Sequence, residues 1–354
     1  MNCRADTVSR SKTIVPFRAK AVRTDRELEC PIIDAGLRAA NVDLTILPDG
    51  VSDAVLIDAV RDADLLLMCY QPVSAGTIAA ASKLKGIVKY GVGIDAIDVD
   101  AARARQIPVV NIPEYAEETV AEGAFALMIA LAKKLVPLSR EMARTGWAWP
   151  MARWLGIDLA GRTLGIVGIG HIGRSMARMA KGFRMRVVGY DPNVGADTMR
   201  QMDVEKFDEL TSMLAISDVV SLHAALSTAT RHIIGARELA AMQPHALLIN
   251  SARGALVDES ALVQALQEKQ IGGAGLDVFS REPLAHNGHP MSALFAMDNV
   301  ILTPHLTFYT QEAMARMEHE TLERCFEILN GQPVLVKSRD PRLRAQTHGV
   351  VFAP

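Results

Sequence analysis

Three polar side chains of types suited to proton transfer and anion binding each follow an apolar run in the second half of the chain: Arg253, Glu282 and His305. The runs, which are typical of buried strands, are residues 247–251, 276–279 and 300–303. Parallel strands bind ligands at their shared carboxyl edge, so we expect the three side chains to converge there. Each alone is more often a surface or capping group, and only their joint placement favours a site.

The chemistry that suits this trio is proton transfer at a hydroxyl or carbonyl oxygen beside a carboxylate. His305 is of the type that exchanges a proton near neutral pH. Glu282, by accepting the other ring N–H, would orient the ring and favour its protonated form. Arg253 carries the planar fork of donors that grips a carboxylate or polarises a 2-oxo group. The trio therefore fits hydride transfer between a nicotinamide and a 2-hydroxy acid.

A glycine pattern, G-x-G-x-x-G, stands between an expected strand and an expected helix. Gly168 permits the tight turn, Gly170 lets the backbone approach a pyrophosphate, and Gly173 allows the helix to pack on the strand. Asp191 ends the next expected strand, 18 residues after Gly173, where a carboxylate accepts both hydroxyls of an adenosine ribose. This order favours NAD over NADP. The alternative is that the glycines serve packing and Asp191 is a turn residue before Pro192.

Apolar runs alternate with amphipathic segments along the chain, which predicts α/β units with parallel sheets. In the first half, strands are expected at residues 13–17, 43–47 and 64–68, with a helix at 52–61. In the second half, strands are expected at 163–168, 186–190, 218–223, 246–250, 273–278 and 300–303, with helices at 172–181, 206–215 and 259–268.

A long helical stretch, residues 120–147, separates the two series of strands and leads into Trp147, Trp149 and Trp154. Its apolar residues exceed one narrow stripe, so we predict a homodimer interface at residues 120–154. The alternative is that all three tryptophans pack within the chain.

Composition excludes several other classes of protein. The chain has 354 residues and a formal net charge of −2, so no overall basic field attracts nucleic acid or an anionic membrane. The longest apolar run, residues 123–132, is too short to span a bilayer. The polar segment 1–12 has no apolar core of a signal peptide, which predicts a cytoplasmic protein. Four scattered cysteines indicate neither a disulfide framework nor a metal site.

From about residue 13 to about residue 336 the sequence resembles the D-isomer-specific 2-hydroxyacid dehydrogenase family. Its arginine, glutamate and histidine motifs match residues 250–259, 275–283 and 302–305, and the separations from Arg253 to Glu282 (29) and from Glu282 to His305 (23) agree as well. The resemblance implies that His305 is the acid/base, Glu282 its partner and Arg253 the substrate-binding cation. It further implies that Asp277 holds the nicotinamide carboxamide.

The resemblance also implies that the amides of Val92 and Gly93 bind the substrate carboxylate and that Tyr90 and Phe308 line the substrate site. The remaining residues expected to contact the cofactor are His171, Ile172, His223, Ala224, Thr230, Ser251 and Ala252, together with Arg253 and His305. The implied fold is α/β, with two doubly wound parallel-sheet domains, a Rossmann-type NAD-binding domain (117–307) being inserted in a flavodoxin-like substrate domain (12–116 and 308–337). Residues 1–11 and 338–354 are expected to be loosely ordered tails.

Residues 68–74, 90–93 and 305–310 are most similar to the branch of C-terminal-binding proteins and their bacterial dehydrogenase relatives. Phosphoglycerate dehydrogenases usually carry an arginine near residues 68–72, which is missing here, although Lys89 could compensate. The leading hypothesis is an NAD-dependent oxidoreductase that interconverts a 2-oxo acid and a D-2-hydroxy acid. The alternative is an NAD(H)-sensing binding protein with weak or no turnover, because that branch includes corepressors that keep the catalytic residues.

Overall fold

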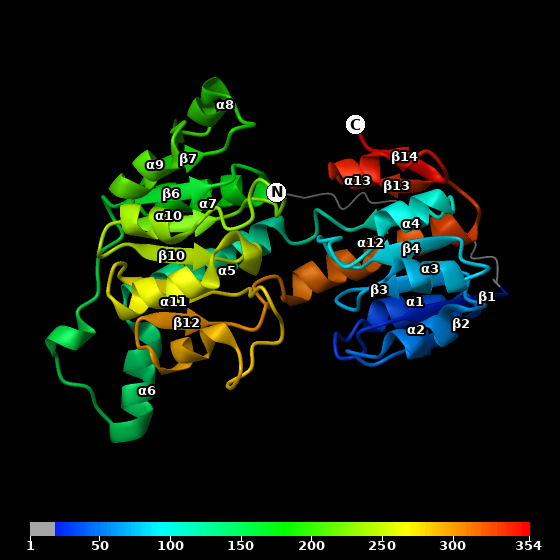
Figure 1. The fold of residues 1–354 in the computed structure, drawn as a ribbon, viewed down its shortest axis with the longest axis horizontal. Coiled ribbons are helices and arrows are strands. Elements are labelled where there is room, and N and C mark those ends of the chain that lie inside the picture. Colours follow the sequence, from blue (N-terminus) through cyan, green and yellow to red (C-terminus); the bar gives the residue numbers. More distant parts are fainter. Residues whose placement is uncertain (1–17) are drawn as a thin grey trace, which may run out of the picture. The chain divides into compact units, whose positions relative to one another are not determined.

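The computed structural model describes residues 18–354, which divide into two compact α/β units (Figure 1). One unit comprises the described residues up to Tyr115 together with Thr310–Pro354, and the other is Ala116–Tyr309. The expected strand at 13–17, the expected tail at 1–11 and the segment examined for a signal peptide lie outside the described residues. No helix among residues 18–354 has the length and apolarity to span a membrane.

The first unit is built on a five-stranded parallel sheet with the order β2-β1-β3-β4-β5. Its strands are β1 (Ala19–Arg23), β2 (Val42–Ile46), β3 (Leu65–Met68), β4 (Gly86–Lys89) and β5 (Val109–Asn111). Strands β3, β4 and β5 are buried along their whole length, because helices cover both faces of the sheet. This order is the flavodoxin-like one, in which ligands lie at the carboxyl edge.

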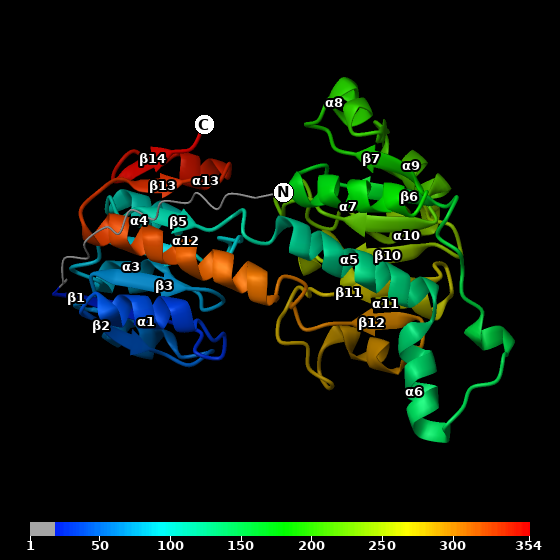
Figure 2. The ribbon, with the colours of Figure 1, turned by 180° about the vertical axis from the view of Figure 1, so that it is seen from behind.

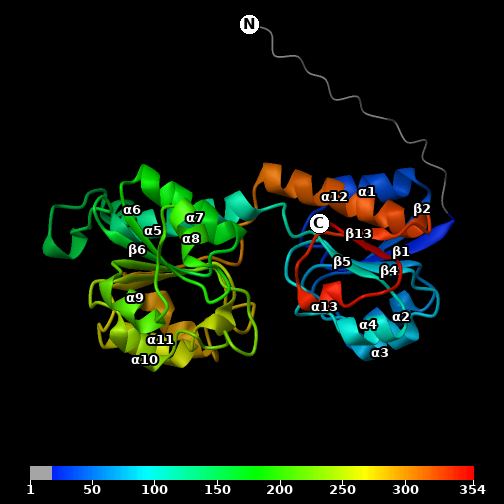
Figure 3. The same ribbon diagram turned by 90° about the horizontal axis from the view of Figure 1, so that it is seen from above.

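Figure 3 shows α1 and α12 on one face of this sheet and α2, α3 and α4 on the other. The helices are α1 (Pro31–Ala39), α2 (Asp53–Val60), α3 (Ala75–Ala80), α4 (Val99–Ala104) and α12 (Gln311–Leu329). Side-chain oxygens of Ser52, Ser74, Asp98 and Thr310 accept N–H groups of the first turns of α2, α3, α4 and α12. Such caps satisfy backbone donors that have no partner within the helix.

The second unit is built on a seven-stranded parallel sheet with the order β12-β11-β10-β9-β6-β7-β8. The strands are β6 (Thr163–Val167), β7 (Arg186–Tyr190), β8 (Glu205–Lys206), β9 (Val219–Leu222), β10 (Leu247–Asn250), β11 (Gly273–Leu276) and β12 (Val300–Leu302). The chain order reverses between β6 and β9, as in a Rossmann-type sheet, and opens a crevice at their carboxyl ends. This fold class agrees with the sequence-based prediction.

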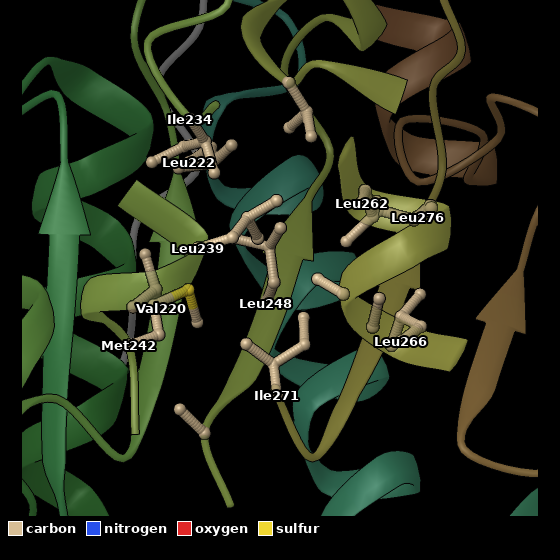
Figure 4. Close-up of a cluster of buried hydrophobic side chains, with 14 of the residues drawn as sticks. Val220, Leu222, Ile234, Leu239, Met242, Leu248, Leu262, Leu266, Ile271 and Leu276 are labelled. Atoms are coloured by element: carbon tan, nitrogen blue, oxygen red, sulfur yellow. The ribbon is translucent and has the colours of Figure 1, made fainter. Parts of the chain in front are cut away.

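Helices α5 and α7 cover one face of the seven-stranded sheet (Figure 2), and α9, α10 and α11 cover the other (Figure 1). The helices of this unit are α5 (Glu117–Ala132), α6 (Leu135–Thr145), α7 (His171–Gly182), α8 (Ala196–Gln201), α9 (Leu210–Ile216), α10 (Ala236–Ala241) and α11 (Glu259–Gln267). Figure 4 shows how Val220 and Leu248 of the sheet pack against Leu239, Leu262 and Leu266 of the helices. Burial of each such side chain stabilises the folded unit by about 1.5–3 kcal/mol. This packing holds the strands whose carboxyl ends carry the predicted site.

The stretch predicted as one helix from 120 to 147 is two helices, α5 and α6. Lys134 adopts a left-handed backbone conformation (φ 55°), which interrupts the helix between them. The apolar residues of α5, including Phe125 and Met128, are buried in the core of their own unit. Helix α6 and the chain after it extend away from the rest of the unit (Figure 2).

The expectation that residues 338–354 are loosely ordered is wrong. This tail forms α13 (Pro341–Arg344) and β14 (Val350–Phe352), and β14 pairs in parallel with β13 (Val334–Val336). Leu343 is fully buried. The sparse periodicity of the segment concealed this one apolar anchor and the polar contacts around it.

Candidate active site

The glycine loop joins β6 to α7 at the crevice of the seven-stranded sheet. Gly168 has φ 94°, and a Cβ there would lie 2.6 Å from the Ala224 nitrogen. A Cβ on Gly173 would lie 2.1 Å from the Gly168 oxygen, whereas one on Gly170 would meet nothing within 4 Å. Gly168 and Gly173 therefore serve the turn and close packing, and Gly170 borders open space at the start of α7. Open space beside a helix N-terminus suits a pyrophosphate.

Asp191 follows β7 directly and is tied to the glycine loop. One carboxylate oxygen accepts the Ile169 N–H at 2.9 Å, and the other accepts the Asn193 N–H at 2.9 Å. A carboxylate has about four acceptor positions, so two remain for the hydroxyls of a ribose. The structure thus places the predicted acid beside the predicted phosphate loop.

Two buried polar atoms at the carboxyl ends of β9 and β10 have no hydrogen-bond partner, His223 Nδ1 and Ser251 Oγ. The other ring nitrogen of His223 lies 2.9 Å from Ser221 Oγ. Burial lowers the pKa of His223 to about 4, so its ring is neutral at pH 7. Unpaired buried polar atoms are costly unless a ligand completes them. Together with the open space at Gly170, they fit a bound dinucleotide.

The other residues predicted to contact the cofactor lie in this unit in varied settings. Ala224 lies against Gly168. His171 begins α7 and is followed by Ile172, and its Nδ1 lies 3.4 Å from Glu117 Oε1. The hydroxyl of Thr230 donates to the Ala225 oxygen at 2.7 Å, within its own loop.

His305 and Glu282 form the predicted pair. His305 Nδ1 lies 2.8 Å from Glu282 Oε2, and the other oxygen of Glu282 accepts the Phe279 N–H at 2.9 Å. Burial opposes the charge of Glu282, but the hydrogen bond and charge of His305 outweigh it and lower the pKa of Glu282. The Phe279 N–H and the positive charge of Arg253 act in the same direction. The two side chains remain 30% and 31% exposed, so a substrate can reach them.

Arg253 follows β10 in a loop that Asn250 shapes. The Asn250 side chain donates to the Arg253 oxygen at 2.9 Å and accepts the Ala252 N–H at 3.1 Å. The Arg253 guanidinium donates to the Ala252 oxygen at 2.7 Å. No role for Asn250 was predicted; an asparagine that ends a buried strand was the available signal.

Asp277, predicted to contact the nicotinamide carboxamide, has four partners within its own unit. Its carboxylate is fully buried and accepts four hydrogen bonds, from the Thr303 hydroxyl, the Leu306 N–H and both the N–H and hydroxyl of Thr307. These bonds use about as many acceptor positions as a carboxylate has, so the predicted carboxamide contact stays a prediction. Asp277 holds the loop that carries His305, whose backbone is left-handed (φ 58°). Strained backbone of this kind is often found at active sites.

The predicted substrate loop, Gly91–Gly93, belongs to the first unit. Asn111 Nδ2 donates to the Val92 oxygen at 2.6 Å, and the Ile112 N–H donates to the Gly91 oxygen at 3.0 Å. The side chain of Tyr90 is fully buried, and its hydroxyl donates to the Thr24 oxygen at 2.6 Å. The expectation that this ring lines a substrate site is therefore wrong.

Phe308, the other residue expected to line the substrate site, is buried and meets the His305 ring edge-on, with 6.3 Å between ring centroids. Along the chain, Arg253 follows β10, Glu282 follows β11 and His305 follows β12. Among residues 18–354 no cluster of His, Cys, Asp and Glu side chains could hold a metal ion.

Comparisons with known proteins point to one family. A model of the D-isomer specific 2-hydroxyacid dehydrogenase, NAD binding domain, matches residues 125–307. Glyoxylate reductase from Korarchaeum cryptofilum is 40% identical over 298 residues, which cover 83% of this chain and 88% of the relative. D-3-phosphoglycerate dehydrogenase from Methanocaldococcus jannaschii is 38% identical over 284 residues, and the chain spans only 53% of that relative.

Solved structures agree. D-lactate dehydrogenase from Aquifex aeolicus, complexed with NAD and lactic acid, has a TM-score of 0.77 and 28% identity and covers 88% of this chain and 96% of that chain. The TT0316 protein from Thermus thermophilus has a TM-score of 0.80 and 34% identity, over 88% of this chain and 97% of that chain. This chain therefore belongs to the D-isomer-specific 2-hydroxyacid dehydrogenase family of NAD-dependent oxidoreductases.

Proposed function

We propose that the chain interconverts a 2-oxo acid and a D-2-hydroxy acid with His305, Glu282 and Arg253 as the reacting groups. The observation that carries this assignment is the 2.8 Å contact between His305 Nδ1 and a Glu282 carboxylate that Phe279 holds on its far side. A histidine oriented in this way has its second nitrogen, Nε2, directed away from the carboxylate, which suits a group that transfers a proton. The same sheet edge carries the glycine loop and Asp191.

In this proposal His305, Glu282 and Arg253 have different roles, which follow from the charge of each side chain. Bound NADH supplies the hydride for the carbonyl carbon. His305 donates a proton from Nε2 to the carbonyl oxygen while its Nδ1–H stays on Glu282, whose carboxylate stabilises the charged ring. Arg253 holds the substrate carboxylate or polarises the carbonyl through its planar donors. In the opposite direction His305 takes the hydroxyl proton.

The second unit would bind NAD through the glycine loop, with Asp191 on the adenosine ribose and His223 and Ser251 completed by the ligand. The first unit would bind the substrate carboxylate through the amides of Val92 and Gly93. Val92 is exposed and its peptide is fixed by Asn111, which suits an anion site made of backbone donors.

The test is turnover of NADH with a panel of 2-oxo acids that includes glyoxylate, pyruvate and bulkier acids. A dehydrogenase gives saturable oxidation of NADH with at least one acid. The competing hypothesis, an NAD(H)-sensing binding protein of the C-terminal-binding-protein type, predicts NADH affinity without turnover. Binding of NADH measured by fluorescence in the same samples separates an inactive preparation from a sensor.

We also propose a homodimer formed through α6 and the arm after it, within residues 120–154. Five large apolar side chains there are exposed in the single chain, Leu135, Met142, Trp147, Trp149 and Met151, and exposed Leu155 follows directly. The rings of Trp147 and Trp149 contact each other edge to face, and both side chains are exposed. An exposed apolar patch of this size usually marks an interface.

A cytoplasmic location stays a prediction.

A further inference from the structure

The C-terminal segment, residues 338–354, contacts the five-stranded sheet at its β5 edge. Strand β5 is one of the two edge strands, and the N–H and carbonyl oxygen of its Val109 have no neighbouring strand on the side away from β4. The Gln346 side chain supplies both partners: its oxygen accepts the Val109 N–H at 2.7 Å, and its nitrogen donates to the Val109 oxygen at 2.9 Å. One carboxamide thus replaces a strand at this position.

The segment holds Gln346 in place by its own contacts. Gln346 is 4% exposed and donates a second bond to the Leu343 oxygen at 3.0 Å. Arg344 donates to the oxygens of Ser338 and Ala353 at 2.7 and 3.0 Å, which closes the segment on itself. These contacts make it a built part of the first unit.

Strand β5 connects this anchor to the Gly91–Gly93 loop. Two residues after Val109, Asn111 donates its side-chain N–H to the Val92 oxygen. A second link comes from Arg342, whose guanidinium lies 3.3 Å from Asp95 just beyond the loop. Both of these side chains are nearly half exposed, so the second link alone is weak.

We infer that residues 338–354 act as a clamp that fixes the Gly91–Gly93 loop, with Gln346 as its positioning residue. This inference rests on the proposed function, in which the loop amides bind the substrate carboxylate. A displaced β5 would move Asn111 and loosen the Val92 peptide. Binding of the 2-oxo acid should therefore weaken, while NADH binding, assigned to the other unit, should not.

The test is Gln346→Glu, which keeps an acceptor for the Val109 N–H but places a carboxylate oxygen against the Val109 and Leu343 oxygens. Gln332→Glu is the matched control, because this substitution makes the same charge change at an exposed position. We expect KM for the 2-oxo acid to rise about tenfold in the first variant, with kcat and KM for NADH within twofold. An unchanged KM for the acid, or an equal rise in both KM values, would overturn the clamp.

Hydrogen–deuterium exchange of the peptide that contains Gly91–Gly93 provides a readout without activity. It should become about fivefold faster in Gln346→Glu and stay unchanged in Gln332→Glu, because only the first loosens the edge. Equal exchange in the two variants would contradict the clamp even if the wild type had no turnover. If Gln346→Glu does not fold, Gln346→Met removes the same bonds at similar volume and is judged by the same two readouts. Loss of turnover in the wild type would refute only the proposed function.

Discussion

At the residue scale, the site depends on how the two oxygens of Glu282 are used. One oxygen is fixed by the Phe279 backbone, and the other faces His305, so the ring has one preferred orientation. The lowered pKa of Glu282 keeps its carboxylate charged through the neutral range. A charged partner favours the protonated ring that reduction of a carbonyl requires.

Replacing Glu282 with glutamine should shift the pH dependence of reduction. The amide keeps a hydrogen bond but loses the negative charge that stabilises a protonated ring. The pH above which kcat for reduction declines should therefore move down by about one unit, and kcat at its plateau should fall less than in a His305 variant. Profiles of kcat against pH for both forms decide this, and an unchanged profile would refute the pairing.

Asp191 should determine the choice between NADH and NADPH. A carboxylate that accepts the ribose 2′-hydroxyl repels a 2′-phosphate. In Asp191→Ser, KM for NADH should rise about tenfold, and the ratio of kcat/KM for NADH over NADPH should fall. Steady-state kinetics with both cofactors provides the ratio, and a wild type that already uses both equally well would show that this role is wrong.

At the element scale, the loops after the strands carry the function and the strands only place them. Asp277 at the end of β11 holds the loop after β12, and Asn250 at the end of β10 shapes the loop of Arg253. Both polar residues are buried, Asn250 as the last residue of its strand and Asp277 directly after its strand. The site is therefore pre-organised by side chains that make no proton transfer themselves.

Replacing Asp277 with asparagine separates the two roles considered for this residue. The amide cannot accept all four bonds, and its NH2 group opposes the donors of Thr303 or Thr307. We expect kcat to fall about 10²-fold because His305 is displaced, while the Kd for NADH stays within threefold. Asp258→Asn, at the start of α11, is a control that should leave kcat unchanged. A tenfold weaker NADH affinity with normal kcat would instead support the predicted contact between Asp277 and the nicotinamide carboxamide.

Sequence patterns were sufficient for elements whose signal is local. Strand β7 begins and ends where the apolar run of residues 186–190 predicted it, and the glycine spacing located the turn before α7. Local patterns could not show that Lys134 breaks the long helix, because a left-handed lysine has no sequence signature. Nor could they show that Tyr90 points into the core, or that Asp277 faces four donors, because both depend on contacts between distant segments.

At the scale of the whole molecule, each unit has polar side chains at the carboxyl ends of its strands. In the first unit, Gln346 of the C-terminal segment also bonds the backbone of the edge strand β5. The arm after α6 carries four exposed large apolar side chains, Trp147, Trp149, Met151 and Leu155. Among the α5 residues that contributed to the prediction of a dimer, Phe125, Leu127, Met128 and Leu131 are buried in the core of their own unit. The case for an interface now depends on the exposed residues of α6 and the arm.

Light scattering should give a mass of about twice the 38.3 kDa of one chain. Leu135→Glu combined with Trp147→Glu should shift this mass toward the monomer, because two charges would be buried in an apolar contact. Val55→Glu, an exposed apolar position in α2 of the first unit, should leave the mass unchanged. A monomeric wild type would reject the dimer, and a double variant that stays dimeric would place the interface elsewhere.

The most direct test of the central claim is His305→Gln, with kcat and the Kd for NADH measured on the same preparation. The account predicts that kcat falls by about 10² to 10⁴, because the ring transfers the proton, while the Kd for NADH stays within a few-fold. A variant that retains more than half of the wild-type kcat would contradict the assignment of His305 as the acid/base.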